Sequence, residues 1–297
     1  MTAITALPTI DDTAAVSKAA TTRNRRRLLL WIAIAWLGLV LFHAVFASWL
    51  PWVTKNPTQT IDATIARKGP SWKAWFGGDQ NGRDIFSYCV YGARASLLIG
   101  VATAFLGMLI GGGLGMIAGY FKGWIDTLIT SVADVMLSFP ALILLIAITS
   151  FWGRDTYKII VGLTILSIAP LARLVRANTL VYTQREFVTA ARALGAKNSR
   201  IVLREIMPNV TPVALAFSFL TVAIIIVAEG TLAFLGVGLK TDIASWGTMI
   251  VQGRTEITRG IYHIVLMPSL VLVSTVLSLN VIGENLRRRF DVRESAV

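Results

Sequence analysis

Long, predominantly apolar runs are the feature that most constrains how this chain can fold. The first run extends from Leu28 to Leu50, contains no charged residue and follows a cluster of four arginines. As an α-helix it is about 34 Å long, enough to cross a hydrocarbon core about 30 Å thick. Further runs follow at about Ala95–Tyr120, Leu128–Phe151, Ile159–Val175, Pro212–Val237 and Ile264–Ile282. The sequence therefore predicts an all-α integral membrane protein with six transmembrane helices.

The composition favours the same class. Hydrophobic residues make up 55% of the chain and charged residues only 15%, and the mean hydropathy is +0.67. Soluble proteins carry about 25% charged residues, because a water-facing surface needs them. The net charge of +12 does not indicate a nucleic-acid partner, because the basic residues lie in short groups between the apolar runs. The single cysteine, Cys89, excludes an intrachain disulfide.

The distribution of Lys and Arg residues predicts how the chain is oriented. Six spans place both termini on the same side of the membrane. If the first helix enters from the cytoplasm, 17 of the 28 basic residues lie inside and 11 lie outside. This bias agrees with the positive-inside rule, so the N- and C-termini are predicted to be cytoplasmic. The first helix is too long for a cleaved signal peptide and is interpreted as a signal anchor.

These spans divide the chain into five segments. Residues 1–27 form a cytoplasmic tail, predicted to be disordered because it shows no apolar period, and residues 28–50 form the anchor helix. Residues 51–94 form an external loop with an interfacial helix that leads into the second span. Residues 95–283 form a core of five helices, and residues 284–297 form a second cytoplasmic tail.

Four glycines in the second span follow one another at intervals of four residues. Each such step turns an α-helix by about 400°, so the four glycines share one slowly drifting face. Lipid tails offer no hydrophobic drive for helix association. Helices in a membrane therefore associate by close packing, which small residues permit because they let the backbones approach. The stripe is therefore predicted to be a helix-packing face and not a ligand site; it consists of Gly107, Gly111, Gly115 and Gly119.

Two prolines and two carboxylates also lie within the predicted spans. Pro140 and Pro170 each remove a backbone donor, which predicts kinks in the third and fourth spans. Asp134 and Glu229 are costly in hydrocarbon, so each is expected to face protein or water and to pair with a basic or amide group. Structural pairing is favoured over a proton relay, because no series of carboxylates and histidines extends across the bilayer.

A cytoplasmic loop over residues 183–208 follows the fourth span and is predicted to form a helix–turn–helix. Thr183 and Glu186 have the spacing of a capping box, so a helix is expected to start there. Good helix formers follow, and Gly195 is placed to end the helix in a left-handed conformation.

The second segment of this loop is amphipathic. It extends from Asn198 to Met207 and is expected to stop at Pro208 and Pro212. The alternative to a projecting helix pair is a connecting loop whose apolar side chains pack back against the membrane domain, and composition does not separate the two. The apolar side chains available to fill a groove on a partner are Phe187, Val188, Leu194, Ile201 and Leu203.

The same loop carries a resemblance to a known family. The run Thr189–Gly195, followed thirteen residues later by Pro208, resembles the EAA loop of bacterial ABC importer permeases. Its Thr-Ala-Ala-Arg-Ala-Leu-Gly form looks like that of the peptide and nickel branch. Three further stretches resemble the C-type permease subunits of oligopeptide, dipeptide and nickel importers. They are Gly78–Asp84 leading into Gly92–Leu97, Ser138–Pro140, and Glu229–Gly238 followed by Ser245–Gly247.

The resemblance implies a type I ABC importer permease fold with a cytoplasmic coupling helix–turn–helix. In that family this permease pairs with a second, B-type permease to form the pore. Two ATPase subunits, which bind ATP and Mg²⁺, dock on the coupling loops, and an extracytoplasmic binding protein delivers the substrate. The residues to which the resemblance assigns ATPase coupling are Glu186, Phe187, Ala190, Ala191, Arg192, Leu194, Gly195 and Pro208.

The chain itself is not predicted to be an enzyme or to bind a cofactor or metal. A P-loop needs the pattern Gly-x-x-x-x-Gly-Lys-Ser/Thr, and no lysine here follows a glycine. His43 and His263 lie far apart at membrane boundaries, which argues against a membrane enzyme. An ion-driven secondary carrier is the other alternative, but it needs no cytosolic helix–turn–helix and often has an inverted repeat that this sequence lacks.

The family branch also implies a location and a substrate class. The location is the bacterial cytoplasmic (inner) membrane. The implied substrates are di- and oligopeptides, although close relatives carry nickel chelates, glutathione, opine-like compounds or haem. The sequence leaves these substrates open, because the binding protein makes most of the selection.

Overall fold

The structure is a computed structural model that describes residues 10–240 and 242–294. Within these ranges the chain consists of helices and loops without a β-strand, and a single β-bridge joins Gly78 and Asp84. Five helices are long and apolar enough to cross a membrane, and one bent pair of helices raises the number to as many as six. The predicted all-α membrane class is confirmed.

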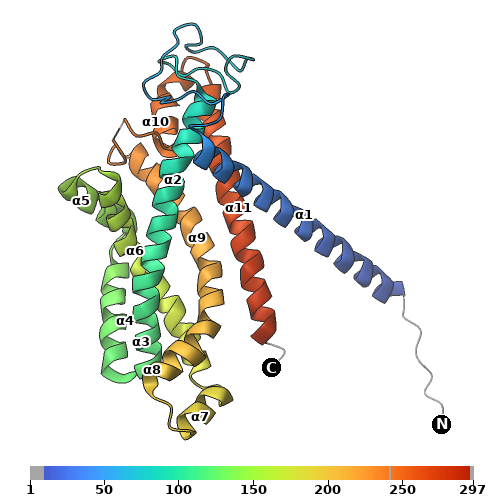
Figure 1. The fold of residues 1–297 in the computed structure, drawn as a ribbon, viewed down its shortest axis with the longest axis vertical. Coiled ribbons are helices and arrows are strands. Elements are labelled where there is room, and N and C mark those ends of the chain that lie inside the picture. The colour runs from blue at the N-terminus through green and yellow to red at the C-terminus, as the bar shows by residue number, and fades with distance from the viewer. Residues whose placement is uncertain (1–9, 241, 295–297) are drawn as a thin grey trace.

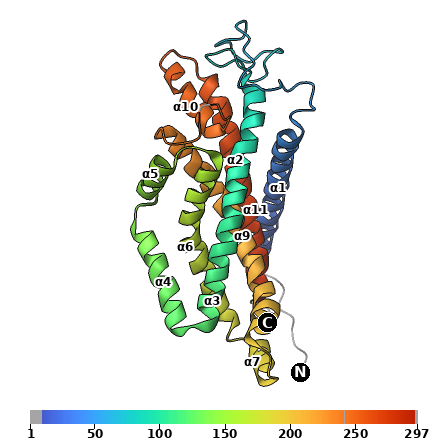
Figure 2. The same ribbon diagram turned by 60° about the vertical axis from the view of Figure 1, so that its left-hand side comes forward.

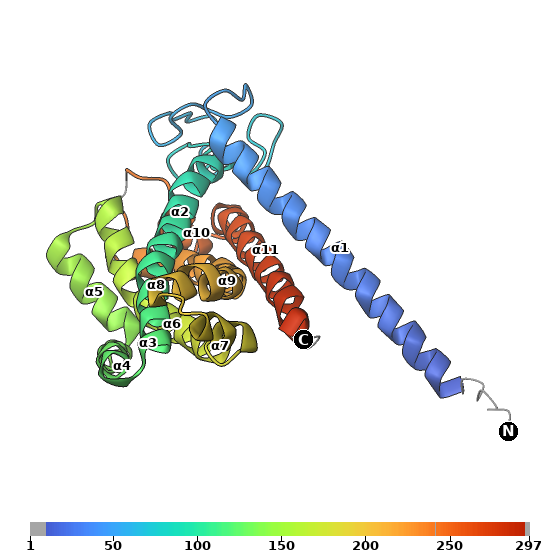
Figure 3. The ribbon, with the colours of Figure 1, turned by 60° about the horizontal axis from the view of Figure 1, so that its bottom comes forward.

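The first helix, α1 (Ile10–Phe46), contains the predicted anchor but starts well before it. From Ile10 onward the prediction of a disordered tail is wrong, because alanine-rich sequence favours a helix even without an apolar period. The part that is apolar enough to span the membrane is Arg25–Phe46. One face of α1 packs against α2 and α11, and the helix diverges from the bundle toward its start (Figures 1 and 3).

The second span is longer than predicted. It comprises α2 (Ile85–Gly107), the π-helix η1 (Met108–Gly112) and α3 (Gly113–Phe121), and it continues without a break for 37 residues. Asp84 caps its first turn, because the carboxylate accepts the Ser87 amide N–H at 3.0 Å. Among residues 51–94 the described helix is the start of α2, and the loop that precedes it ends at Asp84.

The third span is not one helix. α4 (Gly123–Ser138) and α5 (Ala141–Trp152) are bent by 87° relative to each other (Figure 2). Phe139, which precedes Pro140, has extended backbone angles, as the proline ring requires of the residue before it. The kink expected at Pro140 within the apolar run Leu128–Phe151 is thus a full break between two helices.

The remaining spans form the centre of the bundle. They are α6 (Thr156–Tyr182), α9 (Met207–Phe234) and α11 (His263–Glu294). α9 packs against α2, α6 and α11, and α6 also packs against α3. Pro170 lies inside α6, which continues past it. The buried apolar side chains lie between these helices, so the core of the molecule follows α9 along most of its length.

The connecting elements separate to the two ends of the bundle (Figures 1 and 2). α7 (Glu186–Ala193), α8 (Asn198–Arg200) and the π-helix η2 (Ile201–Ile206) lie at one end. The loop 51–84 and α10 (Trp246–Ile257) lie at the opposite end. The loops predicted to be cytoplasmic and those predicted to be external are therefore at different ends.

Candidate functional site

The coupling loop starts later than its sequence pattern predicts. α7 begins at Glu186, and its N-cap residue is Arg185, which makes no side-chain capping bond. The Thr183 hydroxyl instead donates to the Leu180 carbonyl oxygen at 2.8 Å. Thr183 therefore belongs to the end of α6, so the predicted capping box with Glu186 is wrong. Threonine hydroxyls often bond to a carbonyl of the preceding turn, and here that bond keeps Thr183 in α6.

The turn after α7 is the one that the sequence predicts. Gly195 has a φ of +75°, the left-handed conformation that glycine adopts without steric cost. The Gly195 amide donates to the Arg192 carbonyl at 3.0 Å, and the Ala196 amide donates to the Ala191 carbonyl at 3.1 Å. These two bonds close the end of α7, so the predicted left-handed C-cap is confirmed.

The second half of the loop does not stop at its prolines. Asn198–Phe234 forms one helical segment of 37 residues, which passes through α8, η2 and α9. Pro208 falls in the first turn of α9, directly after the π-helix η2, and Pro212 lies inside the helix. The helix continues through both prolines, so the predicted stop at Pro208 is wrong. The second half of the loop and α9 are therefore one continuous helix.

The inner face of the loop packs against the bundle. Val188 and Ile201 are fully buried in a cluster with Val175 of α6. The Tyr120 hydroxyl at the end of α3 donates to the Asn198 side-chain oxygen at 2.8 Å. Val188 and Ile201, which were expected to be available to a partner, instead attach the loop to the membrane domain.

The outer face of the loop remains exposed. Leu194 is 88% exposed beside the Gly195 turn, and Phe187 and Leu203 also expose much of their apolar surface. A groove of about 720 Å³ lies next to this face and is lined in part by Phe187, Pro208 and Phe290 of α11. Of the other residues assigned to ATPase coupling, Glu186, Ala190, Arg192 and Gly195 are exposed, whereas Ala191 is half-buried and packs against the inner cluster.

The glycine stripe of the second span lies against α6. A Cβ atom at Gly111 would lie 2.5 Å from the Ile168 carbonyl oxygen, and one at Gly115 would lie 2.3 Å from that of Ala172. Gly107 and Gly119 meet α6 in the same way, at Ser167 and at Thr179. All four glycines thus lie where the two helices approach most closely.

Two ion pairs join α4 to α6. The Arg173 guanidinium pairs with the Asp134 carboxylate, the basic partner that was expected for this aspartate. The Arg176 guanidinium makes two hydrogen bonds to the Asp126 carboxylate, one of them at 2.6 Å. The planar guanidinium suits such two-point pairing. These pairs hold α4 beside α6 although most of its side chains are exposed.

A buried carboxylate joins α9 to α10. Glu229 is fully buried, and one of its oxygens accepts the Ser245 hydroxyl at 2.8 Å. Its other oxygen has no hydrogen-bond partner among the described residues. A basic or amide partner was expected for Glu229, but its partner is the Ser245 hydroxyl at the start of α10. Ser245 is also the N-cap residue of α10, in a capping box with Thr248.

Ser245→Ala is expected to destabilise the protein by about 1–3 kcal/mol, because it leaves the Glu229 carboxylate without its partner. The measurement is thermal unfolding of the purified complex. Ser131→Ala is the control, since Ser131 is exposed on α4. Equal unfolding temperatures for the two variants would contradict a structural role for the Glu229–Ser245 bond.

At its other end α10 holds the loop 51–84. Glu256 is buried, and the Arg67 guanidinium donates to its two carboxylate oxygens at 2.9 and 3.3 Å. Arg259 donates to the same carboxylate at 2.8 Å. The hydrogen bonds from Arg67 lower the pKa of Glu256 below its usual value, and the charge of Arg259 adds to this. This ion pair links the loop 51–84 to α10.

The lowered pKa of Glu256 predicts how the loop 51–84 responds to acid. A carboxylate with a depressed folded pKa stabilises the fold fully above its unfolded pKa, about 4.3, and progressively less as the pH falls below it. Backbone amides of residues 60–84 are therefore expected to lose hydrogen-exchange protection as the pH falls below about 4.3. Glu256→Gln should remove this pH dependence and Glu284→Gln should retain it; the same acid response in all three proteins would refute the assignment.

The comparisons with known proteins agree with this geometry. Residues 111–295 match the family described as binding-protein-dependent transport system inner membrane component. This match covers more than half of the chain. The chain belongs to this family. It is a multi-pass inner-membrane permease subunit of an ABC importer.

Relatives match this permease over nearly its whole length. The glutathione transport system permease protein GsiD of Pectobacterium atrosepticum is 35% identical over 268 residues, which are 90% of this chain and 89% of the relative. GsiD of Shigella boydii is 37% identical over 270 residues, or 91% and 88% of the two chains. The methionine ABC transporter MetNI in an inward-facing conformation contains a chain with the same fold, at 20% identity and a TM-score of 0.57, over 68% of this permease and 96% of that chain.

Sequence reasoning missed two connections in this permease. Ser245 was noted as part of a family motif, and Arg67 was counted only as an external charge. A Ser-x-x-Thr pattern at residues 245–248 is a signal for an N-cap and could have placed the start of α10. No local signal pairs Arg67 with Glu256, because 189 residues separate them.

Proposed function

We propose that this permease forms half of the translocation pore of an ATP-driven importer of short peptides, with the tripeptide glutathione as the first candidate substrate. The observation that carries the proposal is the similarity to glutathione permeases, at 35–37% identity over about nine tenths of each chain. The second half of the pore would be a B-type permease. A binding protein outside the membrane would deliver the substrate.

The coupling loop 183–208 is the element proposed to contact the ATPase. Its exposed face presents Leu194 and Phe187 around a tight turn, while its inner face is buried against the bundle. Because Asn198–Phe234 is one continuous helix, a displacement of the loop moves α9 with it. The bond between Glu229 and Ser245 then passes that movement to α10 at the opposite end.

ATP hydrolysis is assigned to two partner subunits. This chain carries no P-loop sequence, so the ATP and Mg²⁺ that drive transport would bind to those partners. The coupling loop would then lie in the cytoplasm, together with the C-terminal end of α11, which points to the same end of the bundle (Figure 1). The surplus of basic residues in the proposed cytoplasmic segments supports this orientation.

Uptake of labelled glutathione by cells that lack their own glutathione importer tests the proposal. Cells that produce this permease with its B-type partner, ATPases and binding protein are expected to accumulate the label. Unlabelled tripeptides should compete better than nickel chelates or haem. Competition by a nickel chelate or haem alone would overturn the peptide assignment, and ion-driven uptake by the purified chain in liposomes would overturn the ABC mechanism.

A further inference from the structure

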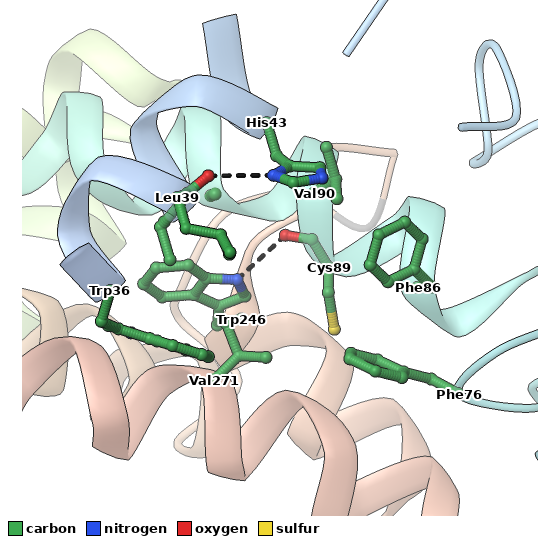
Figure 4. A pocket seen from close by; sticks show the side chains of 11 residues that line it. Trp36, Leu39, His43, Phe76, Phe86, Cys89, Val90, Trp246 and Val271 are labelled. Carbon is green, nitrogen blue, oxygen red and sulfur yellow. Dashed lines mark hydrogen bonds between the residues drawn. The ribbon is translucent and has the colours of Figure 1, made fainter. Parts of the chain in front are cut away.

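A hydrophilic peptide needs a polar path across the membrane, and the side of the bundle next to α1 does not offer one. A cavity of about 70 Å³ lies there between α1, α2 and α11 (Figure 4). The indole N–H groups of Trp246 and Trp36 already donate to protein oxygens, at 3.0 and 3.1 Å. The surface that the wall presents to the cavity is apolar. A polar substrate would therefore lose its hydration on this side without gaining hydrogen bonds in return.

The side of the bundle opposite α1 carries a polar stripe on α4 (Figures 1 and 3). The stripe consists of four exposed residues, Thr127, Ser131, Asp134 and Ser138. Their spacing of four, three and four residues places them on one face of the helix. The face beside the stripe is exposed and apolar, and it consists of Trp124, Leu128, Val132 and Val135. α4 is therefore amphipathic.

α6 contributes the second part of the same surface. It packs against α2, α3, α4 and α9, yet Pro170, Arg173 and Ala177 are exposed, and their spacing places them on one face. The ion pair between Arg173 and Asp134 joins this face to the stripe of α4. The two side chains remain 52% and 60% exposed. The stripe of α4 and the exposed face of α6 together form one surface, which we call the α4–α6 surface.

The length of α6 places the ion pair inside the membrane. α6 has 27 residues and is about 40 Å long, so about 10 Å of it extends beyond a hydrocarbon core about 30 Å thick. Arg173 lies nine residues, or about 14 Å, from the nearer end of the helix at Tyr182. Arg173 is therefore inside the core even if the whole excess length lies at that end.

Acyl chains are not a suitable environment for this surface. Serine and threonine are tolerated in lipid when their hydroxyls bond to their own helix, as Ser138 does with the Asp134 carbonyl oxygen at 2.8 Å. A half-exposed ion pair has no such partner, and charged side chains within spans face the protein interior or a water-filled cavity. We propose that the α4–α6 surface lines the water-filled path of the translocated peptide, with Asp134 and Arg173 as its charged groups. This inference rests on the proposed role of the chain as half of a pore.

Thiol labelling of the assembled transporter in nanodiscs, with and without ATP, tests the proposal. Ser131→Cys is on the polar stripe, and Val132→Cys is the matched control, because Val132 is 54% exposed on the apolar face. A charged methanethiosulfonate that does not cross membranes should label Ser131→Cys at least about tenfold faster than the control, because a thiol in apolar surroundings ionises less. The wild-type protein, whose single cysteine Cys89 is buried, measures the background.

Two outcomes of this labelling would overturn the proposal. An unreactive Ser131→Cys in both nucleotide states would show that lipid or the partner permease covers the surface. Equal rates at the two positions would show that the polar stripe has no aqueous path of its own. Ser138→Cys, also on the stripe, replaces Ser131→Cys if that variant does not assemble. Because labelling needs no substrate, a failure of glutathione uptake would not be mistaken for a failure of this inference.

Asp134→Asn tests whether the ion pair faces the same path. It leaves the charge of Arg173 without its partner, while the Asp126–Arg176 pair still holds α4 beside α6. An anionic reagent should then gain about fivefold over a cationic one in labelling Ser131→Cys, because a nearby negative charge is removed. An unchanged ratio of the two rates would contradict the assignment of the ion pair to the path.

Discussion

Gly195→Asp is expected to abolish substrate uptake while the permease still inserts into the membrane. The left-handed turn at Gly195 lies in open space, so a side chain there meets no other atom of the described structure within 4 Å. Aspartate tolerates this conformation better than most residues, and the fold is therefore retained. In the assembled transporter, however, the carboxylate would be buried without a partner, which costs about 3–5 kcal/mol, or more than 100-fold in ATPase affinity.

The measurement compares uptake, membrane content and co-purified ATPase for the variant and the wild type. Gly260→Asp is a matched control, because Gly260 has a φ of +77° and open space around it, but lies between α10 and α11 at the opposite end. This control should transport normally. Normal uptake by the Gly195 variant would rule out a docking role for the turn.

Gly115→Val is expected to destabilise the second span. The new Cβ atom would lie 2.3 Å from the Ala172 carbonyl oxygen, and a backbone atom of a packed helix has little room to move. Overpacking of this kind costs about 1–3 kcal/mol, which corresponds to a fall in Tm of about 2–12 °C. Thermal unfolding of the purified complex measures the loss.

Gly113→Val provides the control for this prediction. Gly113 begins the same helix, α3, and a Cβ atom there meets nothing within 4 Å. Both variants replace glycine by valine in the same helix, so the change in helix propensity is similar. They differ in that only the side chain at position 115 would collide with α6. Similar unfolding temperatures for the two variants would show that close approach to α6 does not stabilise the second span.

In the loop 183–208 the sequence predicted the turn correctly but not the limits of the two helical segments. Gly195 ends α7 as expected, because a left-handed turn is a property of the residue itself. Thr183 was assigned to the wrong helix, because its hydroxyl donates to the Leu180 carbonyl oxygen of α6 and does not cap α7. Pro208 was taken as a stop, although the helix Asn198–Phe234 continues through it directly after the π-helix η2.

The same division holds for the residues within the membrane. The spacing of Gly107–Gly119 predicted a packing face, since helical periodicity can be read directly from the chain, but it did not name α6 as the partner. Asp134 was expected to find a basic partner, and Arg173 supplies it from α6. For Glu229 the partner is a hydroxyl from a loop sixteen residues away, which no rule of local pattern selects.

By itself, the sequence determined the membrane class, the order of the spans, the coupling loop and the family, because each depends on hydropathy or on residues close together in the chain. Only the tertiary structure decided that the third span is broken at Pro140, and that Val188 and Ile201 face inward. It also decided that α10 connects Glu229 to Arg67. These features depend on which distant side chains meet, and in a bundle of similar apolar helices packing and hydrogen-bond geometry select those contacts.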